Sequence, residues 1–159
     1  MSTKETILQT YTADIVRTAE ERSAVFALRM LVFVEEQGVP AEEELDAYDL
    51  TATHFLIRRD PAPDNTEGGI VGTARLIDKG HGAGKVGRVA IHIEHRGAGA
   101  GAKLMRSIEE VARQEGYNEL VLEAQTYAIG FYEKLGYAAE GDVFMDCDIP
   151  HRLMRYRLE

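Results

Sequence analysis

Apolar runs separated by turn-forming residues divide the chain into strands and helices. The runs THFLI, IVGTARLI and ELVLEA are short and rich in large or β-branched apolar side chains, which is typical of buried strands. The same pattern predicts strands at residues 13–17, 53–57, 70–77, 88–93, 119–124, 137–146 and 152–158, of which the last two form a terminal pair.

Three segments have the spacing of amphipathic helices. Thr18 and Glu21 stand three residues apart, as in a capping box, and predict a helix that begins there and ends at Gly38. Apolar positions over 104–112 predict a second helix, and a compact third helix is predicted over 127–135; a glycine follows each.

The order of these elements predicts the fold class. One strand and one helix precede three successive strands, after which strands and helices alternate. This order favours a mixed sheet with helices on its faces over a doubly wound dinucleotide-binding fold. The segment 59–69, rich in Pro, Asp, Asn and Gly, predicts a surface loop, and 41–52 predicts an irregular stretch or short helix. A chain of 159 residues suits one domain, 1–159.

Composition and charge limit the classes of function. The formal net charge of −9 argues against a nucleic-acid partner. No apolar run approaches the ~20 residues that span a membrane, and the N-terminus MSTKETILQT lacks the pattern of a signal peptide. Cys147 is the single cysteine, so no internal disulfide forms. We therefore expect a cytoplasmic protein without a membrane partner.

The stretch HRGAGAGAKLM places Gly97, Gly99 and Gly101 where a helix is about to begin. Glycines before a helix let backbone N–H groups approach an anion, and the helix N-terminus adds partial positive charge. The loop therefore predicts a pyrophosphate site. It is not a Rossmann fingerprint, because position 102 is alanine, and Lys85-Val86 excludes a Walker-type loop.

Arg96, Gly99 and Gly101 form the pattern Arg-x-x-Gly-x-Gly. Together with the strand GRVAIH before it and the block FYEKLGY about thirty residues later, this loop resembles the GNAT superfamily of acyl-CoA-dependent N-acetyltransferases. The stretches LRMLVFVEEQGVP, VGTARL and DIPHRLM resemble its ElaA-like subgroup. The resemblance runs from about residue 24 to the end of the chain. It implies an α+β fold with a mixed, mostly antiparallel sheet of about six to seven strands and helices on both faces.

The resemblance also implies a reaction and a co-substrate. Acetyl-CoA would donate its acetyl group to a primary amine of a small molecule or peptide by direct attack, with no metal involved. Backbone amides of the loop would hold the pyrophosphate, and the pantetheine arm would lie along the preceding strand, where an amide near Ile91 is the best oxyanion donor. The residues expected to bind the co-substrate in this way are Val89, Ala90, Ile91, Arg96, Gly97, Ala98, Gly99, Ala100 and Gly101.

Three further positions follow from the resemblance. Tyr132 is the expected proton donor to the leaving thiolate, against the alternative of an ordinary core aromatic residue. Ala128, four residues earlier, fits the family pattern for the cofactor site. Gln125 stands where many relatives carry an asparagine that contacts the donor arm.

The residue that deprotonates the amine stays open. The candidates are ordered water and the side chains of Glu35, Glu36, His54, Glu123 and His151.

The remaining histidines, the cysteine and the acidic segment are mostly expected to have structural or surface roles. His81, His92 and His95 lack the spacing of a metal site, so they are expected at the surface. Cys147 is expected to be an inert packing residue. The acidic segment 42–49 is either a solvated face or an attractor for a cationic amine.

Two alternative functions remain at this stage. One is a sensor or partner domain that binds acyl-CoA without catalysis, and the other is acetylation of protein N-termini or side chains. Domains of this family often pair through their terminal strands, so a homodimer is a candidate assembly.

Overall fold

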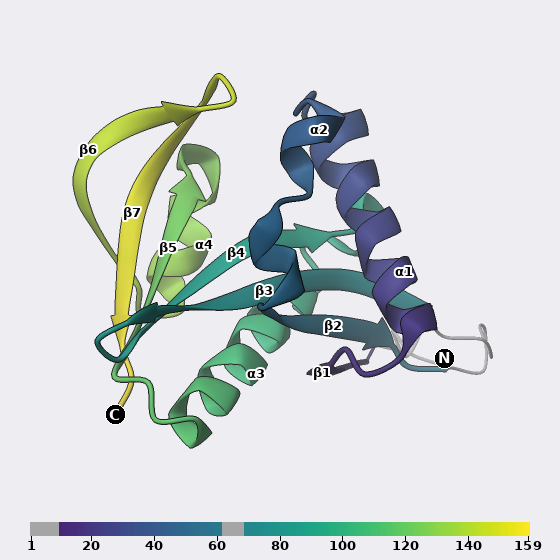
Figure 1. The fold of residues 1–159 in the computed structure, drawn as a ribbon, viewed down its shortest axis with the longest axis horizontal. Coiled ribbons are helices and arrows are strands. Elements are labelled where there is room, and N and C mark those ends of the chain that lie inside the picture. Colours follow the sequence, from purple (N-terminus) through teal and green to yellow (C-terminus); the bar gives the residue numbers. More distant parts are fainter. Residues whose placement is uncertain (1–9, 62–68) are drawn as a thin grey trace, which may run out of the picture.

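The predicted strands lie in one sheet (Figure 1). In the computed structural model, which describes residues 10–61 and 69–159, the sheet has seven strands in the order β1-β2-β3-β4-β5-β7-β6. Their bounds are β1 (Tyr11–Ile15), β2 (Thr53–Arg59), β3 (Gly69–Gly80), β4 (Ala83–Ile91), β5 (Glu119–Gln125), β6 (Ala138–Asp146) and β7 (Ile149–Arg157).

The sheet is mixed and mostly antiparallel, which confirms the predicted fold class. Among the described strands β4 and β5 pair in parallel, and the other neighbours pair antiparallel. The parallel pairing covers only Ala83–Val86 of β4 against Glu119–Leu122 of β5. Beyond those residues the two strands diverge, as Figure 1 shows. Residues of both strands, such as Val89 of β4 and Ala124 of β5, line a cleft at this divergence.

Helices cover the sheet on both faces. They are α1 (Ala19–Arg29), its π-helical continuation η1 (Met30–Glu36), the short α2 (Ala41–Glu44), η2 (Ala47–Leu50), η3 (Ile93–His95), α3 (Ala100–Gln114), η4 (Thr126–Ala128) and α4 (Ile129–Lys134). The predicted capping box is present: the Glu21 amide donates to Thr18 Oγ1 over 3.1 Å. The first helical segment ends before Gly38, whose φ is +76°. These features confirm the predicted start and end of this segment.

Two hydrophobic clusters hold the helices to the sheet. The larger joins α3 to the strands through fully buried side chains such as Leu104, Met105 and Ile108. The smaller joins α1 and η1 to β4 through Leu28, Val32 and Ala90. Full burial of a side chain of this size contributes about 1.5–3 kcal/mol to stability. Both walls of the cleft therefore rest on packed helices.

The glycine-rich stretch DKGHGAGKVG predicts a turn over 78–87, and this prediction is wrong in its extent. β3 continues to Gly80 and β4 begins at Ala83, so the turn is only a few residues long and the strand predicted at 88–93 is longer. The glycine-rich composition misled the prediction because Gly84 serves close packing. A Cβ there would lie 2.9 Å from Leu76 Cδ1.

Two further segments are predicted to lie outside the strands and long helices. The acidic segment 41–52 forms the short helices α2 and η2. Of the loop predicted at 59–69, residues 62–68 lie outside the described part of the chain. Within residues 10–61 and 69–159, no helix is long and apolar enough to cross a membrane.

Candidate active site

Three adjoining cavities occupy the cleft between β4 and β5. The loop cavity, about 430 Å³, lies between β4, the glycine loop and α4. The central cavity, about 120 Å³, lies where β4 and β5 diverge. The outer cavity, about 170 Å³, lies beside α2 and the turn between β6 and β7. Tyr132 lines the loop and central cavities, and His151 lines the central and outer ones. The three cavities thus adjoin one another and share part of their lining.

A bulge in β4 creates the divergence of the two strands. Arg88 has a φ of +52°, and the β3–β4 register shifts between the pairs Arg75–Gly87 and Thr73–Ala90. A bulge bends its strand and interrupts pairing. The pattern of hydrophobic positions gave no sign of it.

The cleft edge of β4 presents unpaired backbone groups. The amide of His92 donates to the Val71 carbonyl of β3 over 2.7 Å. Backbone groups alternate in direction along a strand, so the amides of Val89 and Ile91 point away from β3 and toward the cleft. The family resemblance implies that the pantetheine arm lies along Val89, Ala90 and Ile91, and two of these three residues direct their amides to the cleft.

The glycine loop has the backbone geometry of an anion cradle. Gly97 and Gly99 have φ values of +78° and +90°, a left-handed region that favours glycine. Gly99 is also the N-cap of α3, where no side chain caps the helix and no acidic residue occupies the first turn. Gly101 is explained by close approach, since a Cβ there would lie 3.1 Å from Phe131 Cζ. The amides at the start of α3 are therefore free to receive an anion.

Arg96 anchors this loop. Its Nε donates to the Ile91 carbonyl over 2.8 Å, and its Nη2 pairs with Glu36 over 2.8 Å. Ala98 is exposed and Ala100 is buried. Because alanine has no polar side-chain atom, each could contact a ligand's phosphate only through its backbone amide. The structure thus brings Val89, Ala90, Ile91, Arg96 and the glycines around one cavity, with Arg96 acting on the loop itself.

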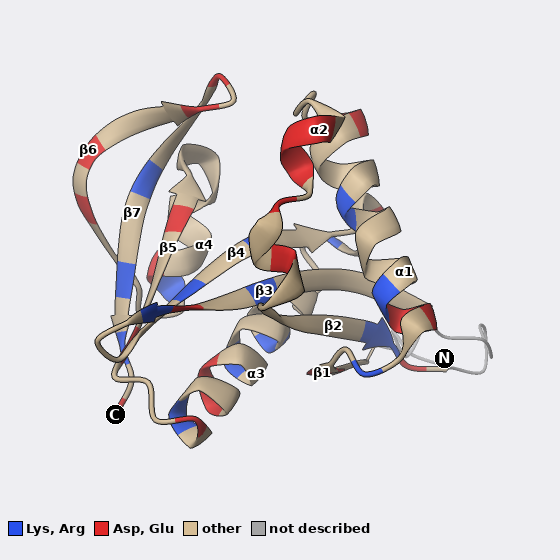
Figure 2. Ribbon diagram, in the orientation of Figure 1, with Lys and Arg blue, Asp and Glu red and all other residues tan. Residues whose placement is uncertain are grey.

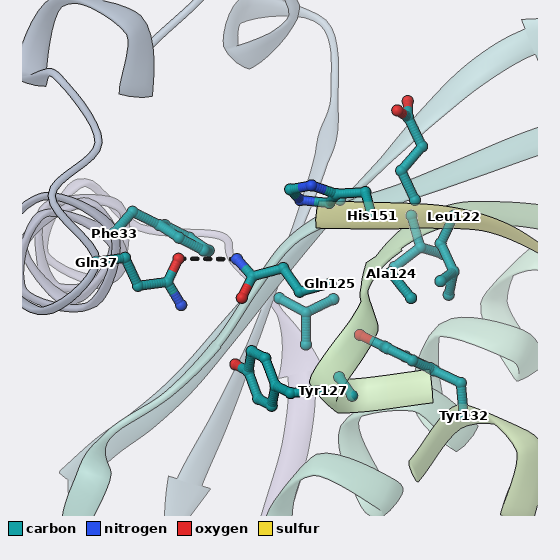
Figure 3. A pocket seen from close by; sticks show the side chains of 13 residues that line it. Phe33, Gln37, Leu122, Ala124, Gln125, Tyr127, Tyr132 and His151 are labelled. Carbon is teal, nitrogen blue, oxygen red and sulfur yellow. Dashed lines mark hydrogen bonds between the residues drawn. The ribbon is translucent and has the colours of Figure 1, made fainter. Parts of the chain in front are cut away.

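Tyr132 places a phenol at the junction of the loop and central cavities. The residue is only 7% exposed, and Figure 3 shows its hydroxyl directed into the central cavity. Burial raises the pKa of this phenol above its ordinary value, and the neighbouring Tyr127 adds to the shift. In the described part of the chain its hydroxyl has no hydrogen-bond partner. Ala128 lines the same two cavities.

Gln125 reaches across the cleft. Its Nε2 donates to Oε1 of Gln37, at the end of η1, over 2.8 Å (Figure 3). It lines the central and outer cavities, one step away from the loop cavity, whereas Gln37 lines all three. Gln37 escaped the sequence analysis because it falls where the helical pattern ends and no motif marks it.

The five candidate bases occupy very different environments. Glu35 is exposed, and Glu36 pairs with Arg96. His54 is buried, with its Nε2 2.9 Å from the Asp49 carbonyl, and lines none of the three cavities. Glu123 lines the central cavity but pairs with Lys85. His151 lines the central and outer cavities, and only its Nδ1 has a partner among the described residues.

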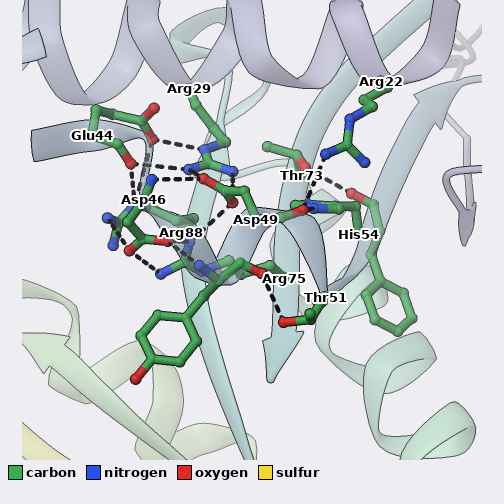
Figure 4. A network of polar contacts seen from close by, with 12 residues as sticks. Arg22, Arg29, Glu44, Asp46, Asp49, Thr51, His54, Thr73, Arg75 and Arg88 are labelled. Carbon is green, nitrogen blue, oxygen red and sulfur yellow. Dashed lines mark hydrogen bonds and ion pairs between the residues drawn. The ribbon is translucent and has the colours of Figure 1, made fainter. Parts of the chain in front are cut away.

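A buried ionic network forms the wall behind the outer cavity (Figure 4). Arg29 binds Glu44 and Asp49, each over 2.7 Å, while Arg75 binds Asp46 and Asp49. Arg88 binds Glu44 and Asp46 more loosely, over 3.4 and 3.3 Å.

The network corrects one prediction. The reading of 42–49 as a solvated face is wrong for Glu44 and Asp49, which are buried because arginines from α1 and β3 neutralise them. Figure 2 shows that α2, which carries Glu42 and Glu43 besides Glu44, is largely acidic.

The lone thiol differs from its prediction in position. Cys147 is exposed in the turn between β6 and β7, not packed in the core. Its Sγ donates to Glu43 Oε2 over 3.0 Å, and this hydrogen bond raises the pKa of the thiol to about 11. The group stays a thiol at neutral pH. No group of three or more potential metal ligands occurs in the described residues.

Comparison with known proteins places the chain in a family. Residues 22–137 match the Acetyltransferase (GNAT) family. The chain is 36% identical over 143 residues to "Uncharacterized N-acetyltransferase YjcF" of Bacillus subtilis, which covers 89% of this chain and 96% of the relative.

Solved structures agree with this match. Escherichia coli ElaA superposes with a TM-score of 0.75 at 26% identity, covering 92% of this chain and 98% of ElaA. An acyl-CoA N-acyltransferase from Pseudomonas aeruginosa superposes with a TM-score of 0.74 at 30% identity, with coverage of 92% and 98%. The chain therefore belongs to the acetyltransferase (GNAT) family and is of the ElaA-like type.

Proposed function

We propose that this protein transfers the acetyl group of acetyl-CoA to a primary amine of a small molecule or peptide by direct attack. One observation carries the proposal: a cleft joins a glycine-lined anion cradle at the start of α3 to the hydroxyl of Tyr132, which has no hydrogen-bond partner among the described residues. Membership of the family shows acyl transfer in general, and the proposal adds acetyl-CoA as the donor and a primary amine as the acceptor.

The donor fits the loop cavity. The free amides at the start of α3 and the dipole of this 15-residue helix would bind the pyrophosphate. The cleft-facing backbone of Val89 and Ile91 offers an edge to which the pantetheine amides can pair as an added strand. A P. aeruginosa structure 30% identical to this chain is described as an acyl-CoA N-acyltransferase, which supports this class of donor.

The chemistry follows from the groups around the cavity. The amine nitrogen attacks the thioester carbon, so a C–N bond forms and the C–S bond breaks. The Ile91 amide, facing the cleft, would stabilise the oxygen as it gains charge. Tyr132, kept protonated by its raised pKa, would give a proton to the departing sulfur. The same dry surroundings raise the basicity of the thiolate, which makes that transfer easier.

The acceptor would enter from the outer cavity. Glu43 and Asp146 line this cavity and stand outside the buried ionic network. Their carboxylates would attract an ammonium group. The lining favours an amine acceptor over an anionic one and leaves small molecules and peptides as the two acceptor classes.

Binding is tested by thermal unfolding with acetyl-CoA. A ligand of the folded state must raise the melting temperature, and we expect a rise at millimolar acetyl-CoA. S-acetyl-N-acetylcysteamine carries the same thioester without the pyrophosphate and should give a much smaller rise. No rise with acetyl-CoA would contradict the proposal. A rise without thiol release from any amine would fit a non-catalytic acyl-CoA-binding domain.

A further inference from the structure

We infer that His151 is the base that takes the proton from the attacking amine. The inference rests on the proposed acetyl transfer and selects one side chain from several carboxylates and imidazoles near the cleft. It is carried by the position of the ring, its hydrogen bond and its surroundings.

His151 lies where an incoming amine must pass. It lines both the central and the outer cavities and is 9% exposed. On β7 it stands opposite Gln125 of β5. Figure 3 shows its ring on the wall of the central cavity across from the Tyr132 hydroxyl. An amine between the two residues would have a proton acceptor on one side and a proton donor on the other.

The hydrogen bond made by the His151 ring determines which of its two nitrogens can accept a proton. Nδ1 lies 2.7 Å from the Ile149 carbonyl oxygen, which can only accept. Nδ1 must therefore carry a proton, and in the neutral ring Nε2 holds the lone pair. Phe144 stacks on the ring at 5.8 Å with an interplanar angle of 22°. The ring orientation is thus set by a backbone group and by an aromatic neighbour.

The charged groups around His151 suit the approach of a cationic amine. Carboxylates face the two cavities from three elements: Glu43 and Glu44 from α2, Asp146 from β6 and Glu123 from β5. They attract the ammonium form of an acceptor toward the ring. Each also has a partner of its own or remains exposed, so none is better placed as the base.

The other titratable groups oppose this only weakly. The cation of Arg88 faces the outer cavity from β4 and is engaged by Glu44 and Asp46. The phenols of Tyr127 and Tyr132 and the thiol of Cys147 complete the titratable lining. The raised pKa values of Tyr132 and Cys147 keep these two groups neutral.

Each proton released in the reaction has an acceptor. Nε2 of His151 takes one proton from the ammonium form of the acceptor and passes it to solvent, which leaves a neutral amine. That amine forms the C–N bond, and the sulfur departs with its electron pair. Tyr132 protonates the sulfur and regains a proton from the nitrogen of the adduct.

The test compares two amines of similar shape and different basicity. Ethylamine is almost entirely ammonium at neutral pH, whereas trifluoroethylamine is mostly neutral and needs no base before attack. We expect His151→Gln to lower kcat/KM for ethylamine by about 100-fold, the size of a general-base contribution. For trifluoroethylamine the loss should stay below about tenfold. The acid limb of the pH profile for ethylamine should also shift in the variant.

The control is His81→Asn, which changes an exposed histidine in the β3–β4 turn whose φ of +55° asparagine tolerates. It should leave both rates unchanged. Equal losses with the two amines, or no loss with ethylamine, would overturn the role of His151. Absence of transfer by the wild-type protein to either amine or to a wider amine panel would instead overturn the proposed function, and this inference with it.

Discussion

Two buried tyrosines near α4 differ in what their hydroxyls meet. Tyr132 and Tyr137 have ring centroids 5.9 Å apart. The Tyr137 hydroxyl donates to Glu109 Oε2 over 2.9 Å, whereas the Tyr132 hydroxyl faces the central cavity without a partner in the described residues. A buried hydroxyl with a protein partner supports the fold, and one that faces a cavity is available for chemistry.

This difference predicts opposite effects of the same substitution. Tyr132→Phe should lower kcat by about 100-fold, because a positioned proton donor is lost, with the affinity for acetyl-CoA and the stability almost unchanged. Tyr137→Phe should lower the free energy of unfolding by about 1–3 kcal/mol, because Glu109 loses a buried partner, with kcat preserved. Steady-state kinetics and urea unfolding of both variants measure the two effects. Equal kcat in Tyr132→Phe and the wild type would assign that residue to packing alone.

Single site residues can be predicted from the sequence only where they belong to a local motif. Tyr132 could be named because it lies in FYEKLGY, a block with a fixed distance from the glycine loop. His151 could not be selected from the five candidate bases, because its place depends on β7 pairing with β5. Gln37 could not be named at all, since its contact with Gln125 joins residues far apart in the chain.

Helix α3 carries a left-handed glycine at each end. Gly99 is its N-cap with a φ of +90°, and Gly116 follows its C-terminal end with a φ of +87°. A Cβ at either position would meet no heavy atom within 4 Å. The two glycines are therefore matched in backbone geometry and space, and only Gly99 lies in the loop cavity.

Alanine substitutions at the two glycines distinguish an effect on stability from an effect on binding. Gly99→Ala and Gly116→Ala should each destabilise the protein by about 1–2 kcal/mol, the cost of a left-handed conformation for alanine. Gly99→Ala alone should weaken acetyl-CoA binding, by tenfold or more, because the cradle amides would turn away. Calorimetric titration with acetyl-CoA measures the affinity. Equal affinity in the two variants would show that the loop does not hold the pyrophosphate.

At the scale of elements the strand pattern predicted the sheet well, because burial of apolar faces dictates it. The first half of β4 was missed for a physical reason. Gly84 is a glycine because Leu76 and Leu120 approach it closely. A glycine that is required by tertiary packing cannot be distinguished in the sequence from a glycine that forms a turn. The bulge at Arg88, which opens the cleft, was missed because an arginine gives no local signal of a φ of +52°.

The whole molecule depends on the buried ionic network that fixes residues 44–50 to α1 and the sheet. Burial alone would raise the pKa of Asp49, but hydrogen bonds from Arg29, the Asp46 backbone and Arg75 bring it well below its ordinary value. The hydrogen bond from Arg75 likewise lowers the pKa of Asp46.

The network predicts loss of stability in acid. A carboxyl whose pKa is lower in the folded than in the unfolded state contributes stability above its unfolded value, about 3.9, and loses it as pH falls further. The free energy of unfolding should therefore decrease below about pH 5. Asp49→Asn should lower it at pH 7 by about 3–5 kcal/mol, because two buried guanidinium groups lose a partner, and should flatten the acid slope.

A surface pair supplies the control. Asp14 pairs with Arg17, and both side chains are more than half exposed. Asp14→Asn should therefore change stability by at most about 1 kcal/mol. Urea unfolding over a pH series measures both variants, and similar losses in the two would contradict the importance of the buried network.

The central claim is that the cleft between β4 and β5 supports acetyl transfer to an amine. The most direct measurement is release of the coenzyme A thiol from acetyl-CoA by the full chain, with and without each of a panel of primary amines. We predict release that depends on the amine and matches the N-acetylated product one to one by mass spectrometry. Thiol release no faster with any amine than without amine, under conditions where acetyl-CoA binds, would contradict the claim.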